Sequence, residues 1–208
     1  MAVKVKVCGM KYPDNIAEVT ALGVDYIGFI FYEKSKRYVG TAQREYIRNL
    51  VQPAKVGVFV NTDLPELVDT IHNFKLDAVQ LHGNETAEFC QALKAETSAI
   101  VIKAFGVDHN FDWNQLESYR DVVDYFLFDT KSSAYGGTGI PFDWSLLNQY
   151  KLDCPYFLSG GLGPDNIGEA LQVDDPRLYA LDLNSKFEVE PGLKDINLLT
   201  QSINNIKR

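Results

Sequence analysis

Residues 155–166 read Pro-Tyr-Phe-Leu-Ser-Gly-Gly-Leu-Gly-Pro-Asp-Asn, and they combine an apolar run, a glycine turn and a polar cap. The run Tyr156 to Leu158 predicts a short buried strand. Three small residues, Ser159 to Gly161, follow at its carboxyl end. The segment Pro164 to Asn166 supplies a polar cap and an early proline, which are typical of a helix start. We therefore predict a strand, a tight turn and a helix N-terminus.

This stretch by itself permits two interpretations of the turn. Gly160 and Gly161 lack a Cβ atom, so their backbone can approach a ligand closely. The helix end that follows offers free N–H groups and a partial positive charge, which suits a phosphate. Glycine is also the default residue of tight turns that bind nothing. The rest of the chain has to decide between a phosphate site and a plain turn.

The same order of strand then helix recurs along the chain. Most predicted strands are continuous apolar runs, as expected for parallel strands covered on both faces. Eight such units favour a closed parallel (β/α)8 barrel over an open doubly wound sheet. We predict an α/β protein with a single domain over residues 1–208 and a loop over 184–192. The strands are predicted over 3–8, 25–31, 55–60, 78–81, 100–105, 125–128, 156–158 and 179–183, and the helices over 13–22, 41–50, 62–74, 85–95, 113–120, 143–149, 166–171 and 195–206.

The composition argues against several classes of function. The 208-residue chain carries a net charge of −8, which disfavours a general binder of nucleic acid or membrane surfaces. Its three cysteines lack the spacing of a disulfide framework or metal site and favour a reducing compartment. No apolar run is long enough to span a bilayer, and the start shows no signal-peptide pattern. We predict a cytoplasmic protein.

The carboxyl ends of the predicted strands carry residues with usable chemistry. This end is the working face of (β/α)8 barrels, and the loops after strands seven and eight commonly form a phosphate site. The opening stretch lies at such a position, which favours phosphate binding over a plain turn. The candidate residues at these ends are Cys8, Arg37, His82, Asp129, Gly160, Gly161, Asn184 and Ser185.

Several candidates also have an ordinary structural explanation. Free cysteine is often buried as a packing residue, which could account for Cys8. Asp129 could cap the turn that follows it. Arg37 lies in a Lys-Ser-Lys-Arg loop typical of solvated charge, although its guanidinium also matches a carboxylate bidentately. His82 could be structural or simply exposed.

Taken together in this order, these residues resemble the phosphoribosylanthranilate isomerases of tryptophan biosynthesis. The resemblance covers the whole chain and is specific as a combination, although no single motif is. The matching motifs are Val5-Lys6-Val7-Cys8-Gly9, Gly28-Phe29-Ile30-Phe31, Ser35-Lys36-Arg37-Tyr38-Val39, Val56-Gly57-Val58-Phe59-Val60-Asn61, Val79-Gln80-Leu81-His82-Gly83-Asn84-Glu85, Phe128-Asp129 with Gly136-Gly137-Thr138-Gly139, Leu158-Ser159-Gly160-Gly161-Leu162, and Asp182-Leu183-Asn184-Ser185 with Pro191-Gly192 and Lys194-Asp195.

The resemblance implies an Amadori rearrangement that uses no metal or cofactor. The aminoaldose ring of N-(5′-phosphoribosyl)anthranilate opens to an enolamine, which becomes the aminoketose 1-(2-carboxyphenylamino)-1-deoxyribulose 5-phosphate. By position, Cys8 matches the general base at ribose C2′, Asp129 the general acid at the ring oxygen, and Arg37 the residue that holds the anthranilate carboxylate. A phosphorylated small molecule is thus the implied partner of a monomer or homodimer. The implied substrate-binding set is completed by His82, Gly137, Gly160, Gly161, Asn184 and Ser185.

The two proton-transfer roles make opposite demands on pKa. A free thiol titrates near ~8.5, so a Cys8 base needs its thiolate stabilised. We expect the lysines that flank Cys8 to point to the other face of the strand, where they cannot help. An ordinary aspartate titrates near ~3.9, so an Asp129 acid needs burial to raise its pKa. The apolar approach through Phe126 and Phe128 is consistent with such burial.

Two loops and two rival functions leave alternatives open. The glycine-rich loop over 130–139 is predicted either as a lid over the substrate or as a flexible surface loop. After Ser185 this chain has Lys186-Phe187-Glu188 where the family commonly has Gly-Val-Glu, so Lys186 either adds charge to the phosphate site or points away. The rival functions are a related barrel isomerase of aminosugars with a two-aspartate acid–base pair, which Cys8 argues against, and a non-catalytic sensor of a phosphorylated metabolite.

Overall fold

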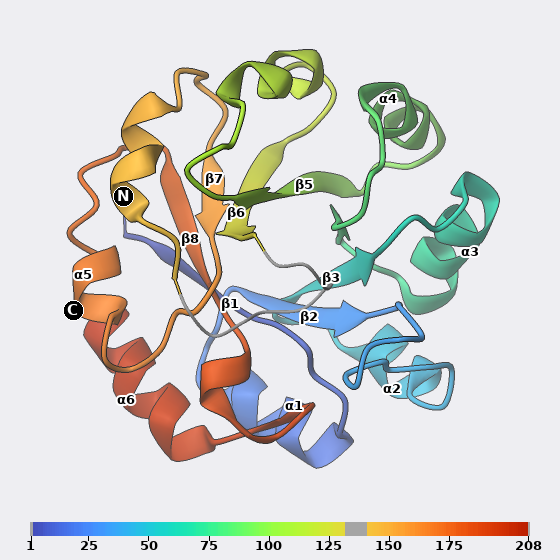
Figure 1. Cartoon of the computed structure of the whole chain (residues 1–208). Helices are drawn as coiled ribbons and strands as arrows, with labels where there is room; N and C mark the ends of the chain where they lie inside the picture. Colours follow the sequence, from blue (N-terminus) through green and yellow to red (C-terminus); the bar gives the residue numbers. More distant parts are fainter. Residues whose placement is uncertain (1, 132–140, 208) are drawn as a thin grey trace.

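The computed structural model describes residues 2–131 and 141–207, and its centre is a closed barrel of eight strands (Figure 1). All eight strands are parallel and pair in chain order, and the last pairs with the first, so the predicted (β/α)8 barrel is confirmed. The strands are β1 (Lys4–Val7), β2 (Tyr26–Ile30), β3 (Ala54–Phe59), β4 (Ala78–Leu81), β5 (Ile100–Val107), β6 (Tyr125–Thr130), β7 (Tyr156–Leu158) and β8 (Leu178–Leu183).

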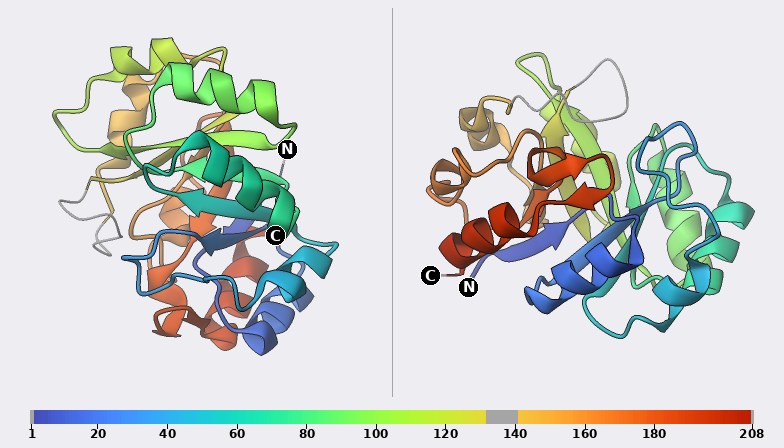
Figure 2. Two further views of the ribbon diagram at one scale, coloured as in Figure 1. Left: turned by 90° about the vertical axis from the view of Figure 1, so that its right-hand side faces the viewer. Right: turned by 90° about the horizontal axis from the view of Figure 1, so that it is seen from below.

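Helices surround the barrel on its outside, as the two further views show (Figure 2). The connections after β5 and β6 are 3-10 helices, where the sequence predicted ordinary helices. The α-helices are α1 (Pro13–Ala21), α2 (Arg44–Asn49), α3 (Leu64–Phe74), α4 (Ala87–Glu96), α5 (Ile167–Ala170) and α6 (Ile196–Ile206), and the 3-10 helices are η1 (Trp113–Tyr119), η2 (Trp144–Gln149) and η3 (Ser185–Phe187).

The segment after β8 is more ordered than predicted. It contains η3 and a small antiparallel pair, β9 (Glu188–Glu190) with β10 (Leu193–Lys194), where the sequence predicted a loop. Asn15 on α1 fixes this pair, because its side chain accepts from the Lys194 N–H at 2.7 Å and donates to the Lys194 carbonyl at 3.0 Å. The hairpin is therefore anchored beside the barrel end that carries the strand-end residues.

Alternation along the strands separates an outer core from the barrel interior. On β1, for example, Val5 and Val7 pack into the large apolar core that contains the inner faces of the helices. A smaller cluster inside the barrel includes Tyr26 and Phe157. This division matters for the site, because residues two apart on one strand share a face.

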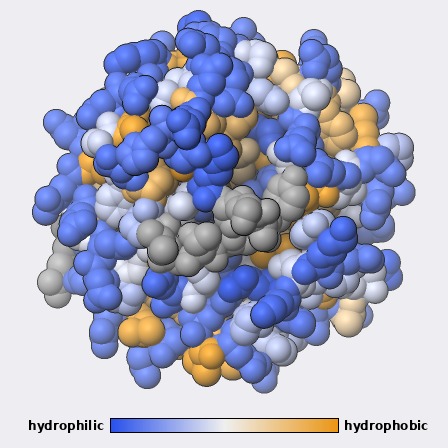
Figure 3. All heavy atoms as spheres, in the orientation of Figure 1, coloured by the Kyte–Doolittle hydropathy of each residue, from blue (hydrophilic) through white to orange (hydrophobic). Residues whose placement is uncertain are grey.

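Large apolar side chains are rarely exposed on this protein. Among the described residues, only Tyr12, Val51 and Val189 are exposed large hydrophobic residues. The face drawn in Figure 3 shows hydrophobic residues scattered among hydrophilic ones rather than gathered in one patch. Within the described ranges, the helices are all too short or too polar to cross a membrane.

Candidate active site

A cavity of about 490 Å³ lies at the carboxyl ends of the barrel strands. Its wall is formed by the ends of several strands and by the basic loop after β2. Residues that are far apart in the sequence therefore meet across one hollow, as the barrel prediction required. Five of the predicted site residues line it, namely Cys8, Arg37, His82, Asp129 and Asn184.

Cys8 follows β1 directly, and its sulfur is almost fully buried. Its backbone N–H continues the ladder by donating to the Leu183 carbonyl at 2.9 Å. The sulfur fills space that Gly28 leaves free, since a Cβ atom at Gly28 would lie 2.7 Å from Sγ. Burial raises the pKa of the Cys8 thiol, while the charges of Lys6 and Lys194 oppose that rise. A base at this position therefore depends on cations nearby.

The predicted orientation of the neighbouring lysines is wrong for Lys6. Lys6 stands two residues before Cys8, so both side chains point into the barrel, and the Lys6 side chain is completely buried. It pairs with Asp182 at 2.9 Å, and its positive charge opposes the rise in the pKa of the Cys8 thiol. Alternation places immediate neighbours on opposite faces, but it returns every second residue to the same one.

Asp129 lies near the end of β6, and polar groups contact its carboxyl oxygens. Oδ1 accepts from the Thr130 N–H at 2.7 Å, and Oδ2 lies 3.5 Å from His82 Nε2. Phe126 and Phe128 belong to the outer core, on the opposite face of the strand. The sequence approach through Phe126 and Phe128 is consistent with burial of this carboxyl group, but these two rings do not supply it.

A chain of hydrogen bonds orients the imidazole of His82. Lys6 Nζ can only donate, and it donates to Gln80 Oε1 at 2.7 Å, which identifies the other end of the Gln80 amide as Nε2. That Nε2 lies 2.7 Å from His82 Nδ1, so Nδ1 is the acceptor. The proton of the neutral ring is then on Nε2, the nitrogen that faces Asp129.

Arg37 reaches the cavity from the loop after β2, but a protein carboxylate already holds it. Its Nε and Nη2 donate to Glu188 at 2.6–3.0 Å, and these hydrogen bonds raise the pKa of Arg37. Glu188 also accepts from Lys194 Nζ at 2.7 Å. Gly9 permits this arrangement, because a Cβ atom there would lie 2.6 Å from Arg37 Cδ and 2.8 Å from Asn184 Oδ1.

This constellation of residues can be compared with known proteins. The family model for N-(5'phosphoribosyl)anthranilate (PRA) isomerase matches residues 5–205. The chain belongs to this family. An N-(5'-phosphoribosyl)anthranilate isomerase of Parabacteroides distasonis is 46% identical over 205 residues, which cover 97% of this chain and 92% of that protein.

Solved structures support the same assignment. The phosphoribosyl anthranilate isomerase of Thermotoga maritima superimposes with a TM-score of 0.88 at 38% identity, covering 99% of this chain and 98% of that one. A phosphoribosyl anthranilate isomerase in complex with reduced 1-(o-carboxyphenylamino)-1-deoxyribulose 5-phosphate superimposes with a TM-score of 0.84 at 35% identity, with the same coverage.

The predicted phosphate loops of this phosphoribosylanthranilate isomerase family member lie beside the cavity. Gly160 and Gly161 both have left-handed backbone conformations, with φ of 86° and 68°. Asn184 lines the cavity, and its Oδ1 accepts from Lys194 Nζ at 2.8 Å. The lining residues of the described chain do not include Gly160, Gly161 or Ser185. The predicted binding residue Gly137 and the predicted lid over 130–139 lie, apart from Thr130 and Lys131, outside the described residues.

The helix after the glycine turn is shorter than predicted. It spans only Ile167–Ala170, because turns occupy the residues before it. The Asn166 side chain accepts from the Gly163 N–H at 2.8 Å, so this backbone donor already has a partner. The Lys186 side chain lies against Gly163, with its Cβ 3.3 Å from the position of an added Gly163 Cβ. The carbon stem of Lys186 therefore lies beside the strand-seven loop, and a contact of its ammonium with phosphate stays a prediction.

Replacing Gly160 by alanine is expected to impair both folding and turnover. A Cβ atom there would lie 2.4 Å from Thr130 N and 2.7 Å from Asp129 Oδ1, and the φ of 86° disfavours any side chain. Strain of this kind costs about 1–3 kcal/mol of unfolding free energy. Thermal unfolding and kcat measure the two effects. Gly168→Ala is the matched control, since nothing lies within 4 Å of its added Cβ, and an unchanged Tm and kcat for Gly160→Ala would contradict the prediction.

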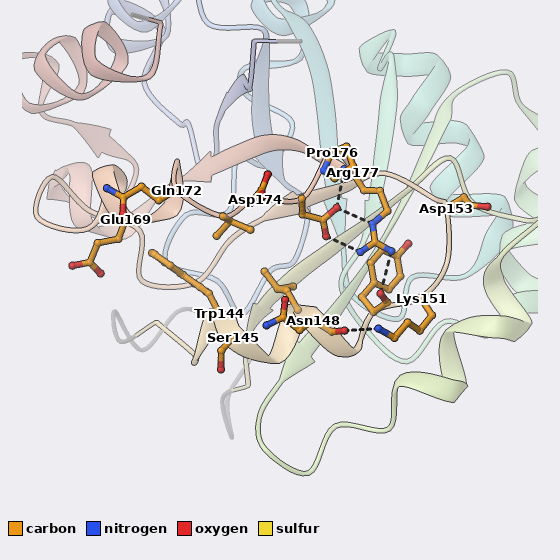
Figure 4. Close-up of a pocket in the computed structure, with 14 residues that line it drawn as sticks. Trp144, Ser145, Asn148, Lys151, Asp153, Glu169, Gln172, Asp174, Pro176 and Arg177 are labelled. Carbon is orange, nitrogen blue, oxygen red and sulfur yellow. Dashed lines mark hydrogen bonds and ion pairs between the residues drawn. The ribbon is translucent and has the colours of Figure 1, made fainter.

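Another hollow, of about 690 Å³, lies outside the barrel between η2 and the segment around α5 (Figure 4). Its Arg177 guanidinium is fully engaged. Arg177 donates to both Asp175 oxygens at 2.8 Å and to two backbone carbonyls, and it stacks on the Tyr150 ring at 4.5 Å. The predicted site residues do not line this hollow, and we assign it a structural role.

Several residues of the site were not predicted as functional. Lys6, Gln80 and Asp182 lie inside matched motifs, and their signal was a polar residue in an otherwise apolar strand. Glu188 and Lys194 lay in a predicted loop and at a helix start, where charge is ordinary. Only the hairpin β9–β10 brings these two residues to Arg37.

Proposed function

We propose that this protein isomerises N-(5′-phosphoribosyl)anthranilate to 1-(2-carboxyphenylamino)-1-deoxyribulose 5-phosphate in tryptophan biosynthesis. The observation that carries the proposal is the single cavity that Cys8, Asp129 and Arg37 share, in a chain of this family. It holds a thiol, a carboxyl group and a guanidinium at the carboxyl end of the barrel, which is where (β/α)8 enzymes work.

The proposed reaction needs two proton transfers across the ribose. Asp129 donates a proton to the ring oxygen as the bond from C1′ to that oxygen breaks. Cys8 then removes the proton from C2′, and the electron pair of that bond forms the enolamine double bond. Tautomerisation of the enolamine gives the ketone without any net gain or loss of protons. A thiol and a carboxyl group lining one cavity suit this division into base and acid.

Arg37 is proposed to hold the anthranilate carboxylate. Its bonds to Glu188 use Nε and Nη2, and no group in the described parts of the chain pairs with Nη1. A bidentate partner on one edge fixes the plane of the guanidinium, which leaves the other edge available for a ligand. Glu188 is itself ionised readily, because hydrogen bonds from Arg37 and Lys194 outweigh the effect of burial and lower its pKa.

A direct turnover assay tests the proposed function. The anthranilate group makes the substrate fluorescent, and we expect the signal to decay when the protein is added. Decay at the uncatalysed rate, together with binding of the substrate, would support the metabolite sensor instead. Conversion of an aminosugar phosphate that lacks anthranilate, detected by chromatography of the product, together with no fluorescence decay for the proposed substrate, would support the rival isomerase.

Substitution of Arg37 by alanine is expected to raise KM by about 10-fold to 100-fold. Hydrogen bonds to a charged group contribute about 1.5–3 kcal/mol, and a bidentate pair is lost. Steady-state kinetics measure the change, and circular dichroism checks that the barrel is folded. Arg120→Ala, which removes an exposed arginine of 53% side-chain exposure, is the control. An unchanged kcat/KM for Arg37→Ala would remove Arg37 from the site.

The solution state is proposed to be a monomer or homodimer. One structure of the Thermotoga maritima relative concerns monomers generated from a dimeric phosphoribosylanthranilate isomerase. Light scattering of this protein distinguishes the two states.

A further inference from the structure

The middle of the barrel interior is charged, where barrels of this kind are usually filled by branched apolar side chains. Lys6 and Asp182 lie there on the adjacent strands β1 and β8, where they are register partners. Lys6 Nζ donates to Asp182 Oδ1 at 2.9 Å and to Gln80 Oε1 at 2.7 Å. The side chain of Lys6 is fully buried and that of Asp182 is 4% exposed. Burying charged groups costs desolvation free energy, so a charged pair at this position indicates a functional role.

Two of the three N–H donors of the Lys6 ammonium are used by Gln80 and Asp182. Cys8 follows Lys6 by two residues, so both side chains share the interior face, and Gln80, Asp182 and Cys8 line the same cavity. The third donor has no oxygen partner among the described residues. Asp182 accepts with its other oxygen from Ser159 Oγ at 3.4 Å, so both oxygens act as acceptors. These partners fix the position of the ammonium directly beneath the proposed base.

We propose that Lys6 is a positioning residue that holds a positive charge and an N–H donor beside the Cys8 sulfur, so that the thiolate can form although the sulfur is buried. The inference rests on the proposed role of Cys8 as the general base. Asp182 has two opposed effects, because its carboxylate orients Lys6 but also repels a thiolate.

Other charged residues near Cys8 also affect the stability of its thiolate. Lys194 on β10 and Arg37 in the loop after β2 also favour the thiolate electrostatically. Both are already paired with Glu188, which reduces their effect at the sulfur. Despite its burial, the pKa of Lys6 is raised by the charges of Asp182 and Cys8, so it stays an ammonium. Of these cations, Lys6 has the largest effect on the pKa of the Cys8 thiol.

The test compares two substitutions that are expected to change the reactivity of Cys8 in opposite directions. The background protein carries Cys90→Ala and Cys154→Ala, so that iodoacetamide can alkylate only Cys8. The alkylation rate is measured against pH, since the thiolate is the reacting form. Lys6→Gln is expected to slow alkylation at neutral pH by at least about tenfold, because an opposite charge in contact shifts a pKa by about 1–3. Asp182→Asn is expected to speed it up, because the repelling carboxylate is gone.

Two further variants guard against an uninformative loss of folding. Lys6→Gln leaves Asp182 buried without its cation. The alkylation experiment is therefore repeated with a double variant, Lys6→Gln with Asp182→Asn, which lacks both charges. The double variant is compared with Asp182→Asn alone. We expect it to be alkylated at least about tenfold more slowly, because it lacks the ammonium of Lys6. Lys4→Gln removes a lysine from the same strand with 47% side-chain exposure, and it should leave the profile unchanged.

The outcomes separate this inference from the proposed function. Equal alkylation profiles in the Lys6 variants and their parents would overturn the role of Lys6, even if the protein is a fully active isomerase. Alkylation of the double variant that is as fast as that of Asp182→Asn alone, or faster, would also overturn it, since the ammonium would then not favour the thiolate. If the profiles shift as expected but Cys8→Ala keeps normal turnover, the inference about Lys6 stands and Cys8 is not the base.

Discussion

Replacement of Cys8 by alanine is expected to lower kcat by at least about 10²-fold, the usual loss when a general base is removed. Its sulfur lines the cavity, and no other thiol of the described residues does so. Substrate binding should change little, since the carboxylate and phosphate contacts are proposed to involve other residues. The fluorescence assay gives kcat and KM separately. Cys8→Ser, which keeps the shape but not the acidity of the thiol, should be similarly impaired.

Cys90 provides a matched control for this prediction. It is a second thiol, fully buried in the outer core on α4, and burial raises its pKa to about 11. Cys90→Ala therefore removes a comparable buried sulfur without touching the cavity, and kcat should stay near that of the parent. Near-normal turnover in Cys8→Ala would contradict the assignment of the base, whereas loss in both variants would indicate that packing alone explains the effect.

The barrel was predictable because its signals are local. Short apolar runs, most of them continuous and each followed by helix-start residues, can be recognised without knowing any contact. The least regular connections were predicted least well, since η1 and η2 are 3-10 helices in place of ordinary ones. Their α-helical and 3-10 forms share the same apolar spacing over so few residues. The alternation of the strands also located Cys8 and Asp129 at one end of the barrel.

The environment of each site residue was harder to predict, because it depends on contacts between distant segments. Arg37 and Glu188 are 151 positions apart, and they meet only because β8 closes against β1 and the β9–β10 hairpin folds back. The bond between Lys6 and Asp182 likewise spans 176 positions. The orientation of Lys6 was different, since the period of two along β1 already placed it on the face of Cys8.

The described site suggests a division between charge that is fixed and charge that reacts. The fixed pairs are Lys6 with Asp182 beneath the cavity and Arg37 with Glu188 at its side. Each pair satisfies a buried or partly buried ion, and each is proposed to leave one donor for a group that the reaction uses. The fixed charges thus orient polar groups in advance, which lowers the cost of reorganisation when charge develops on the substrate.

Replacement of Asp129 by asparagine is expected to lower kcat by at least about 10²-fold as well, because the amide keeps the shape but cannot supply a proton. The side-chain oxygen of asparagine can still accept a hydrogen bond from the Thr130 N–H, so the backbone at the end of β6 should keep its conformation. Steady-state fluorescence kinetics measure the loss, and thermal unfolding checks that the barrel persists. KM should change less than kcat, since the substrate is held by other groups.

The neighbouring imidazole makes this experiment decisive only if His82 is varied too. His82 Nε2 lies 3.5 Å from Asp129 Oδ2, and the bonds through Gln80 and Lys6 give that nitrogen a proton to share. If Asp129 is the acid and His82 orients it, His82→Gln should cost roughly tenfold or less, because an amide N–H can replace the imidazole N–H. A large loss in His82→Gln combined with near-normal turnover in Asp129→Asn would transfer the role of acid to His82. Comparable losses in both, with no extra loss in the double variant, would mean that the two residues act as one unit in delivering the proton.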